Sequence, residues 1–554
     1  MKHLLRALLF LLLLGYGSRE VLHAQTNPGY VGPRANTSDD PASGIYVSPG
    51  GNDATANGSR DRPYKSINAA LAAAQPGGTI VLRSGTYHER NSVRIRKPNI
   101  TIKSAKGEWA VIDLPLDHDP DITYQQSSTI RFDVYDDGSS GGKLQSLEIM
   151  GGFYAVSFET KWDWGQSDRS GASNIIIEDC ILHDSRNDVI KLKPNCDNIT
   201  IRYNEIYNSG RTYAGRADFN TGNNNAEGID NVNSAGMHVH NNHIHDICST
   251  GVYAKGGATG ALIENNLIER TYATGIAIGF HTYLEFFDTG VNPQYYENIN
   301  GVVRNNLIID AGWEGIGLYA SKDAQIYNNT LVNADCGVSK YHSAIYFGIT
   351  DQDGQDGYGH PANINPNIHH NVVRQPASFN NPMIEIRYSD SYGGASALSG
   401  APVMNNNCYY IEGRSAFFND NRGSKFSGGL AAWKTHIGSD NGSVEVNPAL
   451  NANYMTTNAQ CAGMGIQFPL NKDNPTGTAA PAALLTETFA SLKDGTLRIE
   501  SPAAETVQGY SLTGTLLFNY QKPAGDASCC IDQPKGAMVI IKGSSGWTKK
   551  MVMQ

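Results

Sequence analysis

Lysine and aspartate side chains recur in three short segments that share one pattern, DVIKLK (188–193), GIDNVN (228–233) and GVYAKG (251–256). These segments contain Lys191, Lys193, Asp230 and Lys255. A lysine acts as a base when desolvation or neighbouring positive charge brings its pKa toward neutral. Such a base can remove the proton next to a substrate carboxylate, so that an oxygen on the next carbon leaves by β-elimination. We expect Lys193 and Lys255 to be the alternative bases, with Asp230 between them.

The same segment type recurs along the chain with apolar residues at alternating positions, the period of a half-buried strand. The closest copies are 23 and 24 residues apart, and pairs such as Asn265-Asn266 and Asn305-Asn306 mark corners between them. A strand and an asparagine corner repeating at this period predict a solenoid, here a parallel β-helix. The first buried position of each copy is Val156, Ile190, Ile229, Val252, Ile276, Ile316, Ile345 or Ile384.

Alternation also predicts two outward columns of side chains on this strand. Stacked strands lie about 4.8 Å apart, so Lys193 and Lys255 would lie about 10 Å apart, two coils from each other. Small residues such as Gly317 and Gly348 would leave floor space for a ligand. The first column is Ser157, Lys191, Asp230, Tyr253, Ala277, Gly317, Tyr346 and Glu385, and the second is Glu159, Lys193, Val232, Lys255, Gly279, Tyr319, Gly348 and Arg387. We expect Lys191, Tyr253, Tyr319, Tyr346 and Arg387 to bind substrate.

Four inserts, 160–171, 209–226, 281–297 and 350–362, leave the coil next to this strand and would form walls on one face. Their aromatic rings could stack on the apolar faces of sugars or could simply fix their own loops. The predicted wall residues are Trp162, Trp164, Phe286, Phe287, Tyr295 and Tyr296. Arg211 and Arg216 could neutralise a substrate carboxylate. Asp351, Asp353 and Asp356 suggest either a Ca²⁺ site or an acidic loop.

Other interpretations of these residues remain open. Glu227 and Asp230, with Glu159 on the same face, could be the paired carboxyls of a glycoside hydrolase. A surface carbohydrate-binding β-helix would need the aromatic walls but not the lysines. The pairs His238/His240 and His243/His245 could bind a metal, but exposed polar residues and corner hydrogen bonds are the favoured explanation. The asparagine pairs suit corners, where stacked amides can bond one another.

The opening of the chain resembles a known class of proteins. IYVSPGGND (45–53), RPYKSINAA (62–70) and PGGTIVLRSGTYHE (76–89) resemble the start of secreted right-handed parallel β-helix proteins, including polysaccharide lyases of family nine. DVIKLK followed by CDNITIRYNEIYN (196–208) is similar to the lysine region of family six. The resemblance implies a uronate polysaccharide substrate, a Lys193 base and Ca²⁺. The sequence lacks the clustered-aspartate calcium motif of family nine.

The order of the segments along the chain is the order expected of an exported protein. Residues 1–24 have Lys2 and Arg6 before an apolar run, which predicts a signal peptide. We expect a linker at 25–43, the β-helix at 44–475 with a helix over 67–75 covering its open end, a linker at 476–484, and a small β-sandwich at 485–554.

The last segment resembles the C-terminal sorting domain of the type IX secretion system of Bacteroidetes, through YSLTGTLLF (510–518), GAMVIIKG (536–543) and Lys549-Lys550. An ordinary accessory β-domain is the alternative. The resemblance implies passage through that secretion machinery and a released or surface-attached protein.

The net charge and the composition of the chain restrict the classes of partner that we expect it to bind. The net charge of −10 over 554 residues argues against nucleic-acid binding. No long apolar run follows residue 24, so we expect no transmembrane segment in the mature form, and we expect a monomer. The eight cysteines leave disulfide pairing open. Together these features predict an extracellular enzyme degrading a uronate-containing polysaccharide.

Overall fold

The computed structural model describes residues 29–115, 127–162, 168–210, 225–337, 342–350 and 360–472, and the strands of a C-terminal region beginning at residue 489. The chain divides into two compact units, residues 1–480 and 481–554. Within the described part of the chain, no helix is long and apolar enough to cross a membrane. The predicted signal peptide lies outside the described residues.

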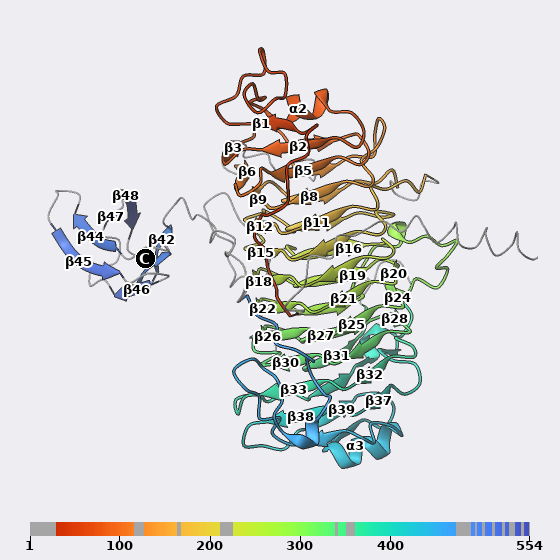
Figure 1. Cartoon of the computed structure of the whole chain (residues 1–554). Helices are drawn as coiled ribbons and strands as arrows, with labels where there is room; N and C mark the ends of the chain where they lie inside the picture. Colours follow the sequence, from red (N-terminus) through yellow and green to blue (C-terminus); the bar gives the residue numbers. More distant parts are fainter. Residues whose placement is uncertain are drawn as a thin grey trace, which may run out of the picture. The chain divides into compact units, whose positions relative to one another are not determined.

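The first unit is a solenoid of three parallel sheets, each with twelve strands among the described residues (Figure 1). Successive strands pass from sheet 1 to sheet 2 to sheet 3, and each coil pairs with the next coil in parallel. Sheet 1 contains β1 (Ile45–Val47), β2 (Thr79–Leu82), β5 (Thr101–Ser104), β8 (Lys143–Gln145), β11 (Ile176–Glu178), β14 (Thr200–Arg202), β17 (His238–His240), β21 (Leu262–Glu264), β25 (Val302–Arg304), β29 (Gln325–Tyr327), β32 (Asn367–His369) and β37 (Val403–Asn405).

Sheets 2 and 3 follow the same order along the solenoid. Sheet 2 contains β3 (Gly85–His88), β6 (Ala110–Leu114), β9 (Leu147–Gly151), β12 (Ile181–His183), β15 (Glu205–Tyr207), β18 (His243–Ile247), β22 (Leu267–Thr271), β26 (Leu307–Ala311), β30 (Thr330–Val332), β33 (Val372–Gln375), β38 (Cys408–Ile411) and β41 (Val444–Glu445). Sheet 3 contains β4 (Val93–Ile95), β7 (Ile130–Phe132), β10 (Val156–Phe158), β13 (Ile190–Leu192), β16 (Ile229–Val232), β19 (Val252–Lys255), β23 (Ile276–Ile278), β27 (Ile316–Tyr319), β31 (Ile345–Gly348), β34 (Ile384–Ile386), β39 (Phe418–Asp420) and β40 (Phe426–Gly428). The last pair, β39 and β40, is antiparallel.

Helices lie at the two ends of the solenoid (Figure 1). Helix α2 (Ile67–Ala73) begins at Ser66, whose side chain accepts a hydrogen bond from the Ala69 amide, and it buries Ile67 and Leu71. The predicted helix is therefore confirmed, although it ends two residues earlier than expected. At the other end, α3 (Leu430–Ile437) buries Trp433, whose ring stacks on Phe418 at 5.3 Å. Both helices contribute to the continuous apolar core.

One corner of the solenoid carries an asparagine ladder, one residue per coil. The side-chain amide of each member donates to the Oδ1 of the next at 3.0–3.1 Å, as expected for stacked corner residues. The ladder consists of Asn204, Asn242, Asn266, Asn306, Asn329, Asn371 and Asn407. The residue before each member adopts a left-handed conformation, for example Asn265 with φ 57°. The corners are thus fixed by amide bonding rather than by apolar packing alone.

The second unit contains two antiparallel sheets. One has the order β42–β43–β46 and the other β45–β44–β47–β48. These strands are β42 (Phe489–Lys493), β43 (Thr496–Glu500), β44 (Glu505–Ser511), β45 (Leu516–Lys522), β46 (Ala527–Cys530), β47 (Met538–Gly543) and β48 (Thr548–Val552). The arrangement agrees with the predicted small β-sandwich. Its role as a sorting domain stays a prediction.

Candidate functional site on the outer face of sheet 3

The strand register of sheet 3 places the members of each predicted column opposite one another on adjacent strands. Lys191 in β13 lies opposite Asp230 in β16, and Asp230 lies opposite Tyr253 in β19. In the second column, Val232 lies opposite Lys255. The apolar residues that alternate with these side chains along the same strands, such as Ile190 and Ile229, are fully buried in the core. Strand alternation therefore puts two lysines and an aspartate together on the outer face.

Asp230 is the centre of this group. The Lys191 ammonium contacts the Asp230 carboxylate directly and lies 3.3 Å from the Asp188 carboxylate. The Lys255 ammonium lies 3.7 Å from Asp230 on its other side and 4.3 Å from the centre of the Tyr253 ring. The two lysines are therefore held differently, because Lys191 contacts two carboxylates and Lys255 has one more distant carboxylate partner.

Three carboxyl groups form a cluster here, which we call the carboxylate cluster: Asp188, Glu227 and Asp230. One oxygen from each lies within 4.8 Å of the others, and all three residues are at most 1% exposed. Each has an oxygen that accepts no hydrogen bond, although ammonium groups lie nearby. Buried oxygens of this kind are costly unless another group binds them.

The site predicted from the sequence does not include Asp188, and it includes Glu227 only as one of the paired carboxyls of a hydrolase. Each lies two residues before the first buried strand position, Ile190 or Ile229, and so occupies a third outward position of the coil. The Glu227 amide donates to Asp188 Oδ1 at 3.0 Å, which links the two coils. This shared position, two residues before the first buried strand residue, could have identified both carboxylates from the sequence. The predicted columns include only residues within the strands and therefore miss them.

The pKa values of this group are shifted in opposite directions. Burial, and then the charge of Asp188, raise the pKa of Glu227 well above its usual range. Burial also raises the pKa of Asp230, but Lys191 and Lys255 outweigh it and hold that pKa below its usual value. Burial lowers the pKa of Lys191, yet Asp230 and Asp188 more than reverse this and hold it well above the ordinary range. Lys191 therefore keeps its proton near neutral pH.

Lys193 lies in a separate group of charges. Its ammonium is 2.7 Å from Glu159 Oε2, and the Arg131 guanidinium lies 3.4 Å from the same oxygen. Ser157 donates to the other Glu159 oxygen at 2.9 Å. Glu159 thus has two cationic partners and a hydroxyl donor, and it would stay paired if Lys193 were removed.

The expectation that small residues further along provide floor space is wrong at Gly317 and Gly348. An added side-chain carbon at Gly348 would lie 1.9 Å from the Tyr319 ring, and one at Gly317 would lie 2.8 Å from it. The Tyr319 hydroxyl donates to the buried carboxylate of Glu314 at 2.7 Å. The glycines therefore accommodate a tyrosine that crosses from one strand to the next.

The other predicted binding residues are distributed around this face. Tyr253 is buried and stacks on Phe280 at 5.1 Å. Tyr346 is also buried, and its hydroxyl accepts a hydrogen bond of 3.5 Å from Arg387. Tyr253 lies next to Lys255, whereas Tyr346 and Arg387 lie several coils further along sheet 3.

The wall aromatics that can be located pack within the inserts. Trp162 is 6% exposed, donates to the Glu285 carbonyl at 2.9 Å and lies under the Arg169 guanidinium. Tyr296 is 8% exposed, and Tyr295 packs edge-on against Phe287. Trp162 and Tyr296 thus fix loops rather than present open faces. Trp164, Arg211, Arg216, Asp351, Asp353 and Asp356 lie outside the described residues.

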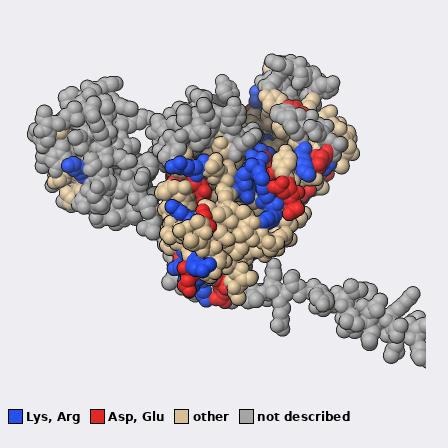
Figure 2. Space-filling view, turned by 90° about the horizontal axis from the view of Figure 1, so that it is seen from above, with Lys and Arg blue, Asp and Glu red and all other residues tan. Residues whose placement is uncertain are grey.

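The oxygen spacing in the carboxylate cluster matches the spacing expected around a hard divalent cation. Ca²⁺ takes oxygen ligands at about 2.3–2.6 Å, so oxygens around one ion lie within about 5 Å of each other. The cluster offers this spacing together with three buried oxygens that accept no hydrogen bond. Figure 2, seen from above, shows that Lys and Arg side chains gather beside Asp and Glu side chains on the described surface. Cation binding here would require the neighbouring ammonium groups to shift.

Comparison with known proteins agrees with the fold. The family model of the right handed beta helix region matches residues 128–350, and a model described as a protein of unknown function (DUF1565) matches residues 49–95. The chain is 39% identical over 77 residues to pectate lyase PEL9 of Emericella nidulans, a match that covers 13% of this chain and 18% of that enzyme. The chain thus spans less than a fifth of the relative's length.

Several solved structures are also similar. Pectate lyase Pel9A is 17% identical with a TM-score of 0.41, over 66% of this chain and 84% of that one. A rhamnogalacturonan lyase is 13% identical with a TM-score of 0.44, over 66% and 87%. PfbA, a surface adhesin of Streptococcus pneumoniae, is 10% identical with a TM-score of 0.40, over 64% and 83%. The parallel sheets and the family match together establish a right-handed parallel β-helix.

Proposed function

We propose that this protein is an extracellular lyase that cleaves a uronate-containing polysaccharide by β-elimination. The observation that carries the proposal is the carboxylate cluster, buried beside two lysines on one face of a β-helix. The short match to a pectate lyase supports the same reaction class. Export through the predicted signal peptide and the type IX machinery would bring the enzyme to such a substrate outside the cell.

In this proposal Lys255 is the base. A base must lose its proton, and Lys191 is bound by two carboxylates that oppose this. Lys193 is engaged by Glu159 at 2.7 Å, whereas Lys255 has its nearest carboxylate at 3.7 Å. Lys255 would take the proton next to the substrate carboxylate, a double bond would form between this carbon and the adjacent one, and the glycosidic oxygen would leave from the adjacent carbon and take a proton from water.

Asp188, Glu227 and Asp230 would hold Ca²⁺ as the predicted cofactor. When bound, the ion would neutralise the substrate carboxylate and stabilise the developing enolate. Lys191, charged and next to the cluster, would contribute positive charge to the same region. Tyr253, Arg387, Arg211 and Arg216 remain predicted substrate contacts, and Asp351, Asp353 and Asp356 remain a predicted second calcium position.

The test is the product of the mature full-length chain on pectate, alginate, chondroitin, heparin-type and hyaluronan substrates. Ultraviolet absorbance from an unsaturated uronate should rise with Ca²⁺ and stay flat with chelator. Lys255→Ala should lower kcat by about 10²- to 10⁴-fold, the usual contribution of a general base. The matched control, Lys143→Ala, changes a lysine on sheet 1 and should leave turnover unchanged. No absorbance change with any substrate would contradict the proposal.

A second candidate, glycoside hydrolysis, is favoured by one observation. Glu227 has a raised pKa and Asp230 a lowered one, the pattern of an acid beside a carboxylate base. A hydrolase would release reducing ends without ultraviolet absorbance, and Glu227→Gln would abolish that release. Binding without either product would instead indicate a carbohydrate-binding β-helix.

A further inference from the structure

A second cluster of metal-ligating side chains lies on sheet 2, away from the sheet 3 site. Glu205 in β15 lies opposite His243 in β18, and His245 follows on the same face of β18. His243 Nδ1 is 3.4 Å and His245 Nε2 is 3.2 Å from the same oxygen, Glu205 Oε1. The ligand atoms of the three residues all lie within 4.8 Å of one another. We call them the histidine–glutamate cluster.

The outer nitrogen of each imidazole faces a second carboxylate. His243 Nε2 lies 2.8 Å from Glu269, and His245 Nδ1 lies 2.7 Å from Asp246. Asp246 is itself held by two hydrogen bonds of 2.8 and 2.9 Å from Arg270. Metal-binding histidines regularly use their second nitrogen in this way, because the carboxylate fixes the ring orientation and makes the ligand more basic.

His243 shows why an ion would suit this position. The residue is 2% exposed, and its Nδ1 is buried without a hydrogen bond. Both inner nitrogens face a single carboxylate oxygen, while the Lys472 ammonium approaches the same oxygen at 3.0 Å. The two rings stack 4.1 Å apart, which holds their nitrogens in a fixed relative position.

We infer that Glu205, His243 and His245 form a binding site for a divalent transition-metal ion, with Zn²⁺ the expected occupant. Two imidazole nitrogens and one carboxylate oxygen suit Zn²⁺ and its neighbours, whereas Ca²⁺ prefers oxygen ligands. The ion would tie β15 to β18 across successive coils and leave at least one coordination position for water. This site is independent of the proposed lyase chemistry.

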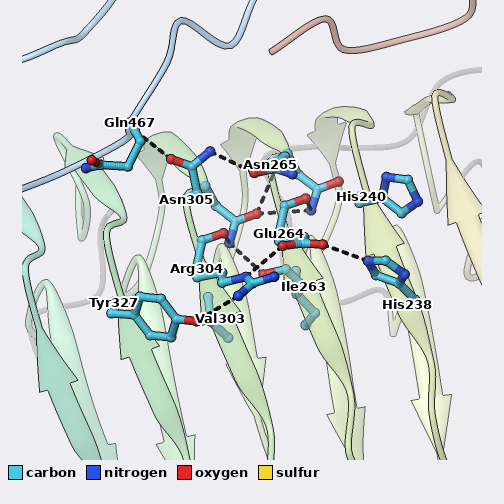
Figure 3. A network of polar contacts seen from close by, with 12 residues as sticks. His238, His240, Ile263, Glu264, Asn265, Val303, Arg304, Asn305, Tyr327 and Gln467 are labelled. Carbon is cyan, nitrogen blue, oxygen red and sulfur yellow. Dashed lines mark hydrogen bonds and ion pairs between the residues drawn. The ribbon is translucent and has the colours of Figure 1, made fainter. Parts of the chain in front are cut away.

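The neighbouring histidine pair on sheet 1 provides a matched contrast (Figure 3). His238 lies 2.9 Å from Glu264, which Arg304 also binds at 2.7 Å, just as Lys472 also binds Glu205. His240 lies 2.9 Å from the Asn241 side chain and has no carboxylate contact among the described residues. The same spacing along a strand therefore gives no shared carboxylate there, and this pair should not bind a metal.

The experiment is titration of chelator-treated, dialysed full-length protein with ZnCl₂ by calorimetry, and with CoCl₂ by visible absorbance. Zn²⁺ should bind one equivalent at the cluster, raise the melting temperature and displace Co²⁺ from a site with a visible absorption band. Excess Ca²⁺ should not compete. His243→Ala/His245→Ala should lose this binding by at least about 100-fold, and His238→Ala/His240→Ala should retain it.

Two further variants keep the test decisive if the histidine variants fail to fold. Asp246→Asn and Glu269→Gln preserve all three ligands but weaken their support, so each should reduce zinc affinity by about 10- to 100-fold. The inference is overturned if neither Zn²⁺ nor Co²⁺ binds the wild type. It is also overturned if binding is lost equally in the sheet 1 control, or if all the sheet 2 variants bind like the wild type.

Discussion

The outer faces of sheets 1 and 3 both carry charged side chains, but their carboxylates are paired with basic residues in different ways. On sheet 1, Glu178 is contacted by Lys143 at 2.8 Å and by Arg202 at 2.6 Å. Glu264 lies between His238 and Arg304 in the same way (Figure 3). Each of these two carboxylates is matched by two basic partners from adjacent strands.

On sheet 3, two successive coils bring together carboxylates that do not each have two basic partners. The carboxylate cluster has three carboxyl groups, and each retains an oxygen that accepts no hydrogen bond. Glu178 is also buried, so the like-for-like difference lies in the basic partners: the Lys191 and Lys255 side chains are 15% and 10% exposed, whereas those of Lys143 and Arg202 are each 31% exposed. The useful sign of a site is therefore burial combined with carboxylate oxygens that accept no hydrogen bond.

The largest difference should come from removing one lysine on each face. Lys191→Met would leave Asp188 and Asp230 without their shared ammonium, which should cost about 3 kcal/mol of unfolding free energy in chelator. Lys143→Met leaves Glu178 with Arg202, so its cost should stay below about 1 kcal/mol. Urea denaturation measures both, and added Ca²⁺ should reduce the Lys191 cost alone. Equal costs for the two variants would remove the distinction between the faces.

A smaller effect should separate the two lysines predicted as bases. Lys193→Met leaves Glu159 paired with Arg131, so the fold should tolerate it. If Lys193 only attracts the anionic substrate, KM should rise about 10-fold, equivalent to about 1.4 kcal/mol, and kcat should change little. Steady-state kinetics on the active substrate measure both constants. A 100-fold fall in kcat at constant KM would instead make Lys193 the base.

The smallest expected effect is on the outer face of sheet 1, where the contribution of Glu264 to the unfolding free energy should depend on pH. The hydrogen bond from His238 lowers the pKa of Glu264, burial opposes this, and Arg304 adds to it, giving a value of about 2. Because the pKa is lower in the folded state, ionised Glu264 stabilises the fold above about pH 4.5, and this stabilisation is lost as pH falls toward 2. Glu264→Gln should cost on the order of 1 kcal/mol at pH 7 and less at pH 3. Unfolding free energies at both pH values check this, and a constant difference would contradict it.

The sequence was sufficient to predict the solenoid and the columns of sheet 3. Strand alternation is strict, and the shortest coils repeat every 23 or 24 residues, so the sequence alone aligns Lys191, Asp230 and Tyr253 in one column, as the strand register confirms. The asparagine ladder was predictable for the same reason. Side chains that repeat once per coil must stack.

Contacts between coils were harder to predict. Asp188 and Glu227 are 39 residues apart because an insert separates their coils, so no short motif connects them. Glu205 likewise comes from the coil before His243, which sequence spacing alone could not indicate. The Tyr319 ring occupies the space beside Gly348 because of its side-chain orientation, which strand periodicity does not specify.

The asparagine ladder also gives the solenoid an electrical direction. Each amide donates one hydrogen bond to the following coil and another to a main-chain carbonyl of the preceding coil, but its oxygen accepts from the preceding ladder member, so the side-chain series from Asn204 to Asn407 runs in one direction. The series begins where Asn204 accepts the Cys180 amide and ends where Asn407 donates to Asp440. Aligned amides polarise one another. The corner that shapes each turn is therefore also a one-way line of dipoles whose positive end meets a carboxyl group.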